Sequence, residues 1–246
     1  MSAWLKGFPL ALGFLTRLCP ARLAEPKDLA RAVAWLPAVG LILGCVVVLP
    51  FWLGLLRGQT WVQAWLIVAF SAFLTRGLHL DGLSDVLDAS AAHAESERFW
   101  AIVKDSRTGA FGVIGLALAV AGQVAICEAL LRTGLFGGVA WTFCLGRFAA
   151  LSLGAACRNL TRPGLGGSFI AGADAPAVLL GLAVTALSGL ALVPPAGHAL
   201  ALCLAAAALA PLYLLARRVQ GINGDFLGAA VVLGELAAGV GLAAGL

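Results

Sequence analysis

The stretch AVAWLPAVGLILGCVVVLPFWLGLL, residues 32–56, contains no charged side chain. A membrane-spanning helix needs about 20 predominantly apolar residues, so this stretch alone is long enough to cross a bilayer. The rest of the chain shares its character, because 61% of the 246 residues are hydrophobic and only 11% are charged. Soluble domains carry about 25% charged residues. The sequence therefore predicts an all-α, polytopic integral membrane protein embedded in a lipid bilayer.

Further uncharged runs predict about seven transmembrane helices in all. The run from Ala175 to Ala216 is long enough for two helices, and the prolines of VPPAGH at 193–198 divide it. A shorter apolar segment at residues 3–18 predicts an N-terminal interfacial or re-entrant helix. The polar segments are too short to build a second core, so residues 1–246 are expected to form one membrane-embedded catalytic domain. The remaining predicted spans are 58–75, 108–127, 133–156 and 227–246.

The basic residues are distributed unevenly between the two sides that seven spans define. Thirteen of the sixteen Lys and Arg residues fall on the side of the N-terminus, and only Arg57 and Arg132 fall on the other side. The positive-inside rule makes the first side cytoplasmic. This count also places the segments near 79–107, 157–174 and 217–225 together on that face. Because the basic residues sit at the ends of apolar runs, they are interpreted as topology signals, and we expect no nucleic acid partner.

The stretch HLDGLSDVLDA, residues 79–89, concentrates acidic residues beside a membrane span. Asp81, Asp85 and Asp88 have the spacing i, i+4, i+7, which places them on one face of a helix. A solvated helix end with arginine partners would look the same, but ionisable groups next to a membrane are commonly functional. Hard oxygen ligands without a His or Cys cluster suit Mg²⁺, or Mn²⁺ as a substitute, together with a phosphorylated substrate. His79 is a candidate general base or a hydrogen-bond donor to phosphate. It could equally be an interfacial histidine whose hydrogen bonds are satisfied within the protein.

A second polar segment precedes the third span, in ERFWAIVKDSRTGAFGVIG at 97–115. It begins as a short amphipathic helix and continues with Lys104, Asp105, Ser106 and Arg107. Lys and Arg can hold phosphate oxygens, and the free amides at the start of the next helix favour an anion. The same residues could be a topology anchor, although Asp105 between the two cations favours a site.

Two further positions complete the candidate residues. In GINGDFLGAA, residues 221–230, Gly224 and Asp225 lie at the mouth of the last span, where a plain turn would have the same sequence. Arg147 lies inside the fourth span, where an arginine costs at least about 2.5 kcal/mol. It is therefore expected to face the bundle interior and to pair with a substrate phosphate or a carboxylate, for which Glu235 is one candidate.

Taken jointly, these motifs resemble the cobalamin 5′-phosphate synthases, also called adenosylcobinamide-GDP ribazoletransferases. The resemblance covers nearly the whole chain, and the acidic motif and KDSRTGAFG are its most specific parts. The matching segments are FLTRL at 14–18, WLPAVGLILG at 35–44, LHLDGLSDVLDA at 78–89, KDSRTGAFGVIGL at 104–116, GR at 146–147 and GDFLGA at 224–229.

The resemblance implies the last assembly step of the cobalamin nucleotide loop, with Mg²⁺ as cofactor. In that step α-ribazole, or its 5′-phosphate, attacks adenosylcobinamide-GDP and GMP is released. The partners are thus a corrinoid and a ribazole, the location is the bacterial cytoplasmic (inner) membrane, and assembly into a homo-oligomer is left open.

The chemistry implied by this resemblance assigns roles to the candidate residues. Asp81, Asp85 and Asp88 would bind the metal. Lys104, Arg107 and Arg147 would hold diphosphate oxygens, with Ser106 and Gly224 beside them. Asp105 or Asp225 would complete the metal shell or accept the hydroxyl proton.

Two other classes remain as alternatives. Another membrane phosphotransferase or prenyltransferase would also hold a magnesium diphosphate with aspartates. The motif expected of CDP-alcohol phosphotransferases, Asp-Gly-x-x-Ala-Arg followed by Gly-x-x-x-Asp-x-x-x-Asp, is absent, and the second acidic motif expected of prenyltransferases is missing. A transporter would place Arg147 and Glu235 along a pathway, but the halves of the chain show no convincing internal repeat.

Overall fold

The computed structural model of the protein describes residues 7–21, 24–92 and 95–245. Over these ranges it is helical, and its one β-type contact is an isolated bridge between Thr161 and Ile222. The elements are α1 (Gly7–Leu15), α2 (Pro26–Ala32), η1 (Val33–Trp35), α3 (Leu36–Trp52), α4 (Thr60–Leu74), α5 (Leu78–Ala91), α6 (Ser96–Val103), α7 (Ala110–Arg132), α8 (Phe136–Ala156), η2 (Arg158–Leu160), α9 (Leu165–Ala171), α10 (Ala175–Leu192), α11 (Pro195–Arg218) and α12 (Gly224–Ala244).

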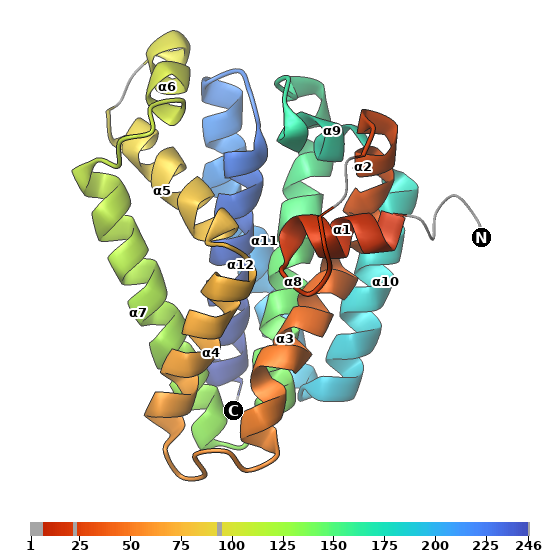
Figure 1. The fold of residues 1–246 in the computed structure, drawn as a ribbon, viewed down its shortest axis with the longest axis vertical. Coiled ribbons are helices and arrows are strands. Elements are labelled where there is room, and N and C mark those ends of the chain that lie inside the picture. Colours follow the sequence, from red (N-terminus) through yellow and green to blue (C-terminus); the bar gives the residue numbers. More distant parts are fainter. Residues whose placement is uncertain (1–6, 22–23, 93–94, 246) are drawn as a thin grey trace.

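Six helical segments of the described chain are long and apolar enough to cross a membrane, and a bent pair makes up to seven. The six are α2 to α3 taken together, α7, α8, α10, α11 and α12. The predicted polytopic helical bundle is therefore confirmed (Figure 1). The predicted third span ended at residue 127, but α7 continues to Arg132. The last turn carries Glu128 and Arg132, which form an ion pair at i,i+4 and so keep the charged end helical.

The bent pair consists of α4 and α5, whose axes differ by 88°. With 15 residues, α4 is only about 22 Å long, shorter than the roughly 30 Å hydrocarbon core. The break falls at Arg76 and Gly77, which both have left-handed backbone angles (φ 57° and 69°) that end a right-handed helix. This bend places the acidic motif of α5 at one end of the bundle.

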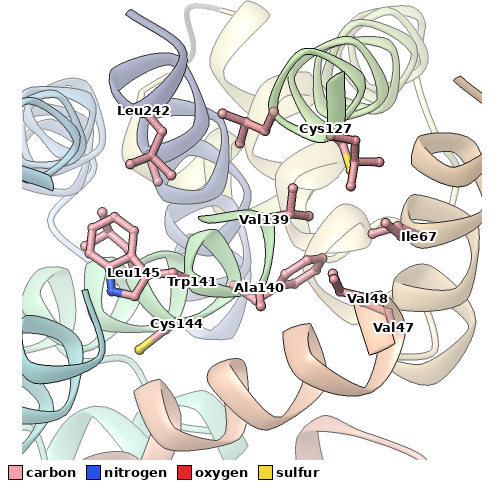
Figure 2. Close-up of a cluster of buried hydrophobic side chains, with 14 of the residues drawn as sticks. Val47, Val48, Ile67, Cys127, Val139, Ala140, Trp141, Cys144, Leu145 and Leu242 are labelled. Carbon is pink, nitrogen blue, oxygen red and sulfur yellow. The ribbon is translucent and has the colours of Figure 1, made fainter. Parts of the chain in front are cut away.

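Helices α8 and α12 form the centre of the bundle and are the most buried of its long helices. Of the apolar stretch of α8, 78% is buried, whereas the value is 22% for each of α7, α10 and α11, which lie outside it. Figure 2 shows the core around α8, where Trp141, Leu145 and Val139 pack with residues of α3, α4, α7 and α12. The indole nitrogen of Trp141 donates to the Thr185 carbonyl oxygen at 2.9 Å, so its polar atom is satisfied inside the core.

The predicted N-terminal helix is present as α1, which lies across the bundle helices in Figure 1. Its packing partners belong to α2, η1, α3 and α9, and the cluster includes Ala11, Leu15 and Phe169. The beginning of the predicted segment 3–18 lies outside the described residues, as do Lys6 and Arg22 of the charge count.

The three polar segments that the charge count placed on one face do lie together (Figure 1). The Trp100 indole and the Ser96 hydroxyl both donate to the Val219 carbonyl oxygen, at 3.0 and 2.5 Å, which ties α6 to the end of α11. The 157–164 segment is tied to the same loop, because the amide of Arg162 donates to Ile222 and the amide of Ile222 donates to Leu160, each at 2.9 Å. These backbone bonds assemble one functional end of the bundle.

Candidate active site

A pocket of about 320 Å³ lies at this end of the bundle. Its walls come from segments far apart in the sequence: α1, α3, α5, α8, α9 and α12, with the loop that precedes α9. Ligand pockets in proteins typically measure about 300–1,000 Å³, so its size suits a small ligand. The polar lining residues are His79, Asp81, Arg147, Asn223 and Asp225, and the apolar ones include Phe14, Leu36, Leu78, Leu165, Phe169 and Val231.

The start of α12 fixes one side of the pocket. Asn223 is the N-cap residue, and its side-chain oxygen accepts from the amides of Asp225 and Phe226 at 3.2 and 3.4 Å. Asparagine is among the residues that best satisfy these otherwise unpaired amides. Its side-chain nitrogen donates to a carboxylate oxygen of Asp225 at 2.6 Å. The motif Asn-Gly-Asp thus holds the Asp225 carboxylate in place, and this is a role for Asn223 that the sequence reasoning missed.

Close packing of α5 on α12 brings two of the predicted carboxylates to the same pocket. A Cβ atom placed on Gly82 would lie 2.8 Å from the Asp225 carbonyl oxygen, so only glycine fits there without movement. This contact sets Asp81, the neighbour of Gly82, beside Asp225 on the pocket wall. Two residues 144 positions apart in the sequence therefore meet because position 82 carries no side chain.

The acidic motif is helical as predicted, but its three aspartates have different surroundings. The carboxylates of Asp81 and Asp85 make no hydrogen bond or ion pair with any residue that the structure describes. Asp88 instead accepts from the amides of Gly109 and Gly112, each at 2.7 Å, one on each carboxylate oxygen. The free amides that the sequence predicted for an anion at the start of α7 are therefore taken by a carboxylate of the chain itself. Asp88 joins α5 to α7.

The magnesium site stays a prediction. Within the described ranges, no three or more His, Cys, Asp or Glu side chains are arranged to hold a metal ion. Seven positions along a helix correspond to about 10 Å of axial rise, so the backbones of Asp81 and Asp88 lie far apart for two ligands of one metal ion. Asp81 and Asp85 nevertheless fit a hard cation, since their oxygens are free and Asp85 lies within electrostatic reach of Asp81 and Asp225.

Arg147 lies inside the bundle, as its position in a span predicted, and its partner is Glu235. The two side chains are 3% and 9% exposed and form an ion pair. Gln123 donates to the other Glu235 oxygen at 2.7 Å. A second terminal nitrogen of Arg147 lies 3.5 Å from Nδ1 of His79, and Nε has no partner although it is buried. Arg147 also lines the pocket, so it links the polar wall to the bundle interior.

The segment 104–107 lies at the surface, away from the pocket lining. Arg107 binds Asp105 with its guanidinium group (Nη2 to Oδ2, 2.6 Å) and with its backbone amide, and these hydrogen bonds lower the pKa of Asp105 to about 2. Lys104 and Ser106 are exposed. The structure thus brings His79, Asp81, Arg147, Gly224 and Asp225 together at one pocket and places Lys104, Asp105, Ser106 and Arg107 outside it.

Replacing Asp88 with Asn is expected to destabilise the fold. Asn retains one oxygen but turns an NH₂ group toward one of the two amides, so a hydrogen bond to a charged group, worth about 1.5–3 kcal/mol, is lost. The free energy of unfolding in detergent is the measurement. Asp85→Asn is the matched control on the same helix, because Asp85 has no hydrogen bond to lose. Equal stability of the two variants would contradict the joining role of Asp88.

Comparison with known proteins identifies relatives of this chain. The sequence profile of the cobalamin-5-phosphate synthase family matches residues 7–243. An adenosylcobinamide-GDP ribazoletransferase of Nitratidesulfovibrio vulgaris is 45% identical over 98% of this chain and 96% of its own length. Proteins of the same name from Syntrophobacter fumaroxidans and Thiobacillus denitrificans are 40% and 38% identical, over 90% and 97% of this chain and 92% and 97% of their own lengths. No solved structure matches. With the family profile and full-length relatives in agreement, this chain belongs to the cobalamin-5-phosphate synthase family.

Proposed function

We propose that the protein joins adenosylcobinamide-GDP to α-ribazole, or to its 5′-phosphate, and releases GMP. A ribose hydroxyl oxygen of the ribazole forms a bond to the phosphorus that carries the cobinamide. The bond from that phosphorus to the bridging oxygen breaks, the oxygen leaves with GMP, and the hydroxyl proton is lost. The observation that carries this proposal is that Asp81, Arg147 and Asp225 line one pocket in a chain of this family.

The carboxylates of α5 and α12 are proposed to serve the reacting groups. Asp81 and Asp85, with Asp225 near them, are the residues that would hold Mg²⁺ or Mn²⁺. The cation would neutralise charge on the diphosphate and on the departing GMP. Asp225 keeps one oxygen free of its bond to Asn223, so it can accept the hydroxyl proton directly or through water. His79 reaches the same pocket and is a second acceptor.

The cations divide into an inner and an outer group. Arg147 is held in place by its ion pair with Glu235 and lines the pocket, so it is positioned to donate to a ligand oxygen there. Lys104 is exposed outside the pocket and is proposed to contact the nucleotide part of the corrinoid substrate. Arg107 would reach that part only by exchanging its bond to Asp105 for one to phosphate. We therefore propose a direct role for Lys104 and a conditional one for Arg107.

The site is proposed to face the cytoplasm from the bacterial inner membrane. The apolar helices make this a multi-pass membrane protein. The basic residues collect on the side of the pocket, and the positive-inside rule makes that side cytoplasmic. Both the nucleotide product and divalent cations would be exchanged there.

GMP release by the purified protein in liposomes tests the proposal. With adenosylcobinamide-GDP, α-ribazole and Mg²⁺, we expect GMP and the joined corrinoid in equal amounts. Removing divalent metal with EDTA is expected to abolish the reaction, and adding back Mg²⁺ or Mn²⁺ to restore it. A protein that forms no GMP but carries labelled corrinoid across the vesicle membrane would be a transporter instead. Full activity after exhaustive chelation would remove the metal from the proposal.

A further inference from the structure

We propose that the 320 Å³ pocket is the binding site of the acceptor nucleoside, with its aromatic base against the Phe14 and Phe169 side chains of α1 and α9 and its ribose at Asp81 and Arg147. The corrinoid and its diphosphate would remain outside the pocket, on the Asp85 side of Asp81. This inference rests on the proposed function and assigns one of its two substrates to this pocket.

Size is the first reason. A volume of about 320 Å³ is at the lower end of the range for drug-sized ligands. A nucleoside of a bicyclic base falls in that class. A corrin ring with its amide side chains and an attached dinucleotide-like tail is several times larger, so it cannot be enclosed here. Only the smaller substrate can be enclosed whole.

The distribution of polarity in the lining is the second reason. One wall, from α1, α3 and α9, is apolar, and it contains Phe14 and Phe169, whose ring centres lie 4.7 Å apart. Aromatic side chains favour contact with another ring system in stacked or tilted geometry. The opposite wall, from α5, α8 and α12, carries the carboxylates and Arg147. A riboside of an aromatic base has the same division into an apolar and a polar half.

Charge is the third reason, because the polar wall is negative. Asp81 and Asp225 contribute two carboxylates, while the positive charge of Arg147 is already matched by Glu235. A bare diphosphate would be repelled from this wall, whereas neutral hydroxyl groups can donate to the carboxylates. The Asp81 carboxylate accepts no hydrogen bond from any residue that the structure describes. A ribose hydroxyl would supply that donor.

The arrangement also explains how the two substrates could meet. Asp81 lines the pocket and lies within electrostatic reach of Asp85, which is not part of the lining. A nucleoside inside the pocket would therefore present a hydroxyl to a diphosphate held on the outer side of Asp81. The attacking oxygen and the phosphorus would meet at the mouth of the pocket, beside the Asp81 carboxylate.

Steady-state kinetics on Phe169→Leu and Phe14→Leu test this assignment. Leu keeps the wall apolar but removes the aromatic faces, so we expect KM for α-ribazole to rise about tenfold while KM for adenosylcobinamide-GDP stays within twofold. Phe70→Leu is the matched control, because Phe70 on α4 is 49% exposed and does not line the pocket. Equilibrium dialysis of labelled α-ribazole against the wild type without corrinoid is expected to show binding that both pocket variants weaken.

The outcomes separate this inference from the proposed function. If the wild type releases no GMP from the two substrates, the proposed function fails. If the wild type is active but the pocket variants raise KM for the corrinoid instead, or change neither KM, the pocket assignment is overturned while the function stands. Should Phe169→Leu fail to fold, since Phe169 is buried, the half-buried Phe14 position decides alone.

Discussion

Replacing Asp81 with Asn is expected to lower the rate of GMP release at least about a hundredfold while leaving the fold intact. The loss follows because Asp81 lines the pocket, lies within electrostatic reach of Asp85 and is a proposed ligand of the metal ion. A bound metal ion stabilises transition-state charge by several kcal/mol, and each 1.4 kcal/mol is about a tenfold change in rate. Stability should not fall, because Asp81 is exposed and has no hydrogen bond to lose within the described residues.

The measurement is initial GMP release at saturating substrates, together with the unfolding midpoint in detergent. Asp28→Asn is the control, because Asp28 is also an aspartate outside the core and pairs only with Arg31 at the surface. Wild-type rates in Asp81→Asn would remove Asp81 from the mechanism. A variant that is inactive because it is unfolded would show a lowered midpoint, so the two causes are distinguishable.

Replacing Glu235 with Ala is expected to destabilise the protein by about 3–5 kcal/mol, because the substitution leaves the Arg147 charge buried without a partner. Gln123 would lose its acceptor at the same time. Unfolding in detergent measures the effect. Asp28→Ala is the control, since Asp28 pairs with Arg31 near the surface, and such pairs contribute about 0–1 kcal/mol. Equal effects of the two substitutions would show that Glu235 stabilises the fold no more than a surface carboxylate does.

A double variant separates stability from activity. Replacing Glu235 with Leu and Arg147 with Met together removes both charges, and apolar replacements of buried ion pairs are often neutral or stabilising. We expect this variant to be as stable as the wild type but deficient in GMP release, because Arg147 lines the pocket. A fully active double variant would show that the pair serves the fold alone.

The acidic motif illustrates how far sequence reasoning reaches. The spacing of Asp81, Asp85 and Asp88 predicted a helix with its aspartates on one face, and α5 is that helix. Spacing describes only the helix itself, so it does not contain the partners on other helices. Asp88 is bound by amides of α7, and Asp81 meets Asp225 of α12, and both contacts depend on packing between segments far apart in the chain.

Nothing in the sequence assigned residues to the apolar wall of the pocket, although Phe14 and Leu36 lie in segments that resemble the family. Phe14, Leu36 and Phe169 are ordinary residues of apolar segments, and each would suit a core or a lipid-facing position equally well. Their role follows from where α1 and α9 lie against α3 and α12, which no local pattern encodes. Pro163 and Gly164, directly before α9, are a local sign that the chain bends there, but they do not indicate what the bend brings together.

The sequence by itself determined that this protein is a helical membrane bundle, which segments share one face, and that Arg147 is buried. These follow from hydropathy and charge, which act on each segment separately, since a bilayer sorts residues before helices pack. Tertiary structure alone decided which carboxylates meet, that Glu235 neutralises Arg147, and that an apolar wall faces a negative one. Those contacts depend on helix bends and close approaches such as Gly77 and Gly82, whose effect exists only once neighbouring helices are in place.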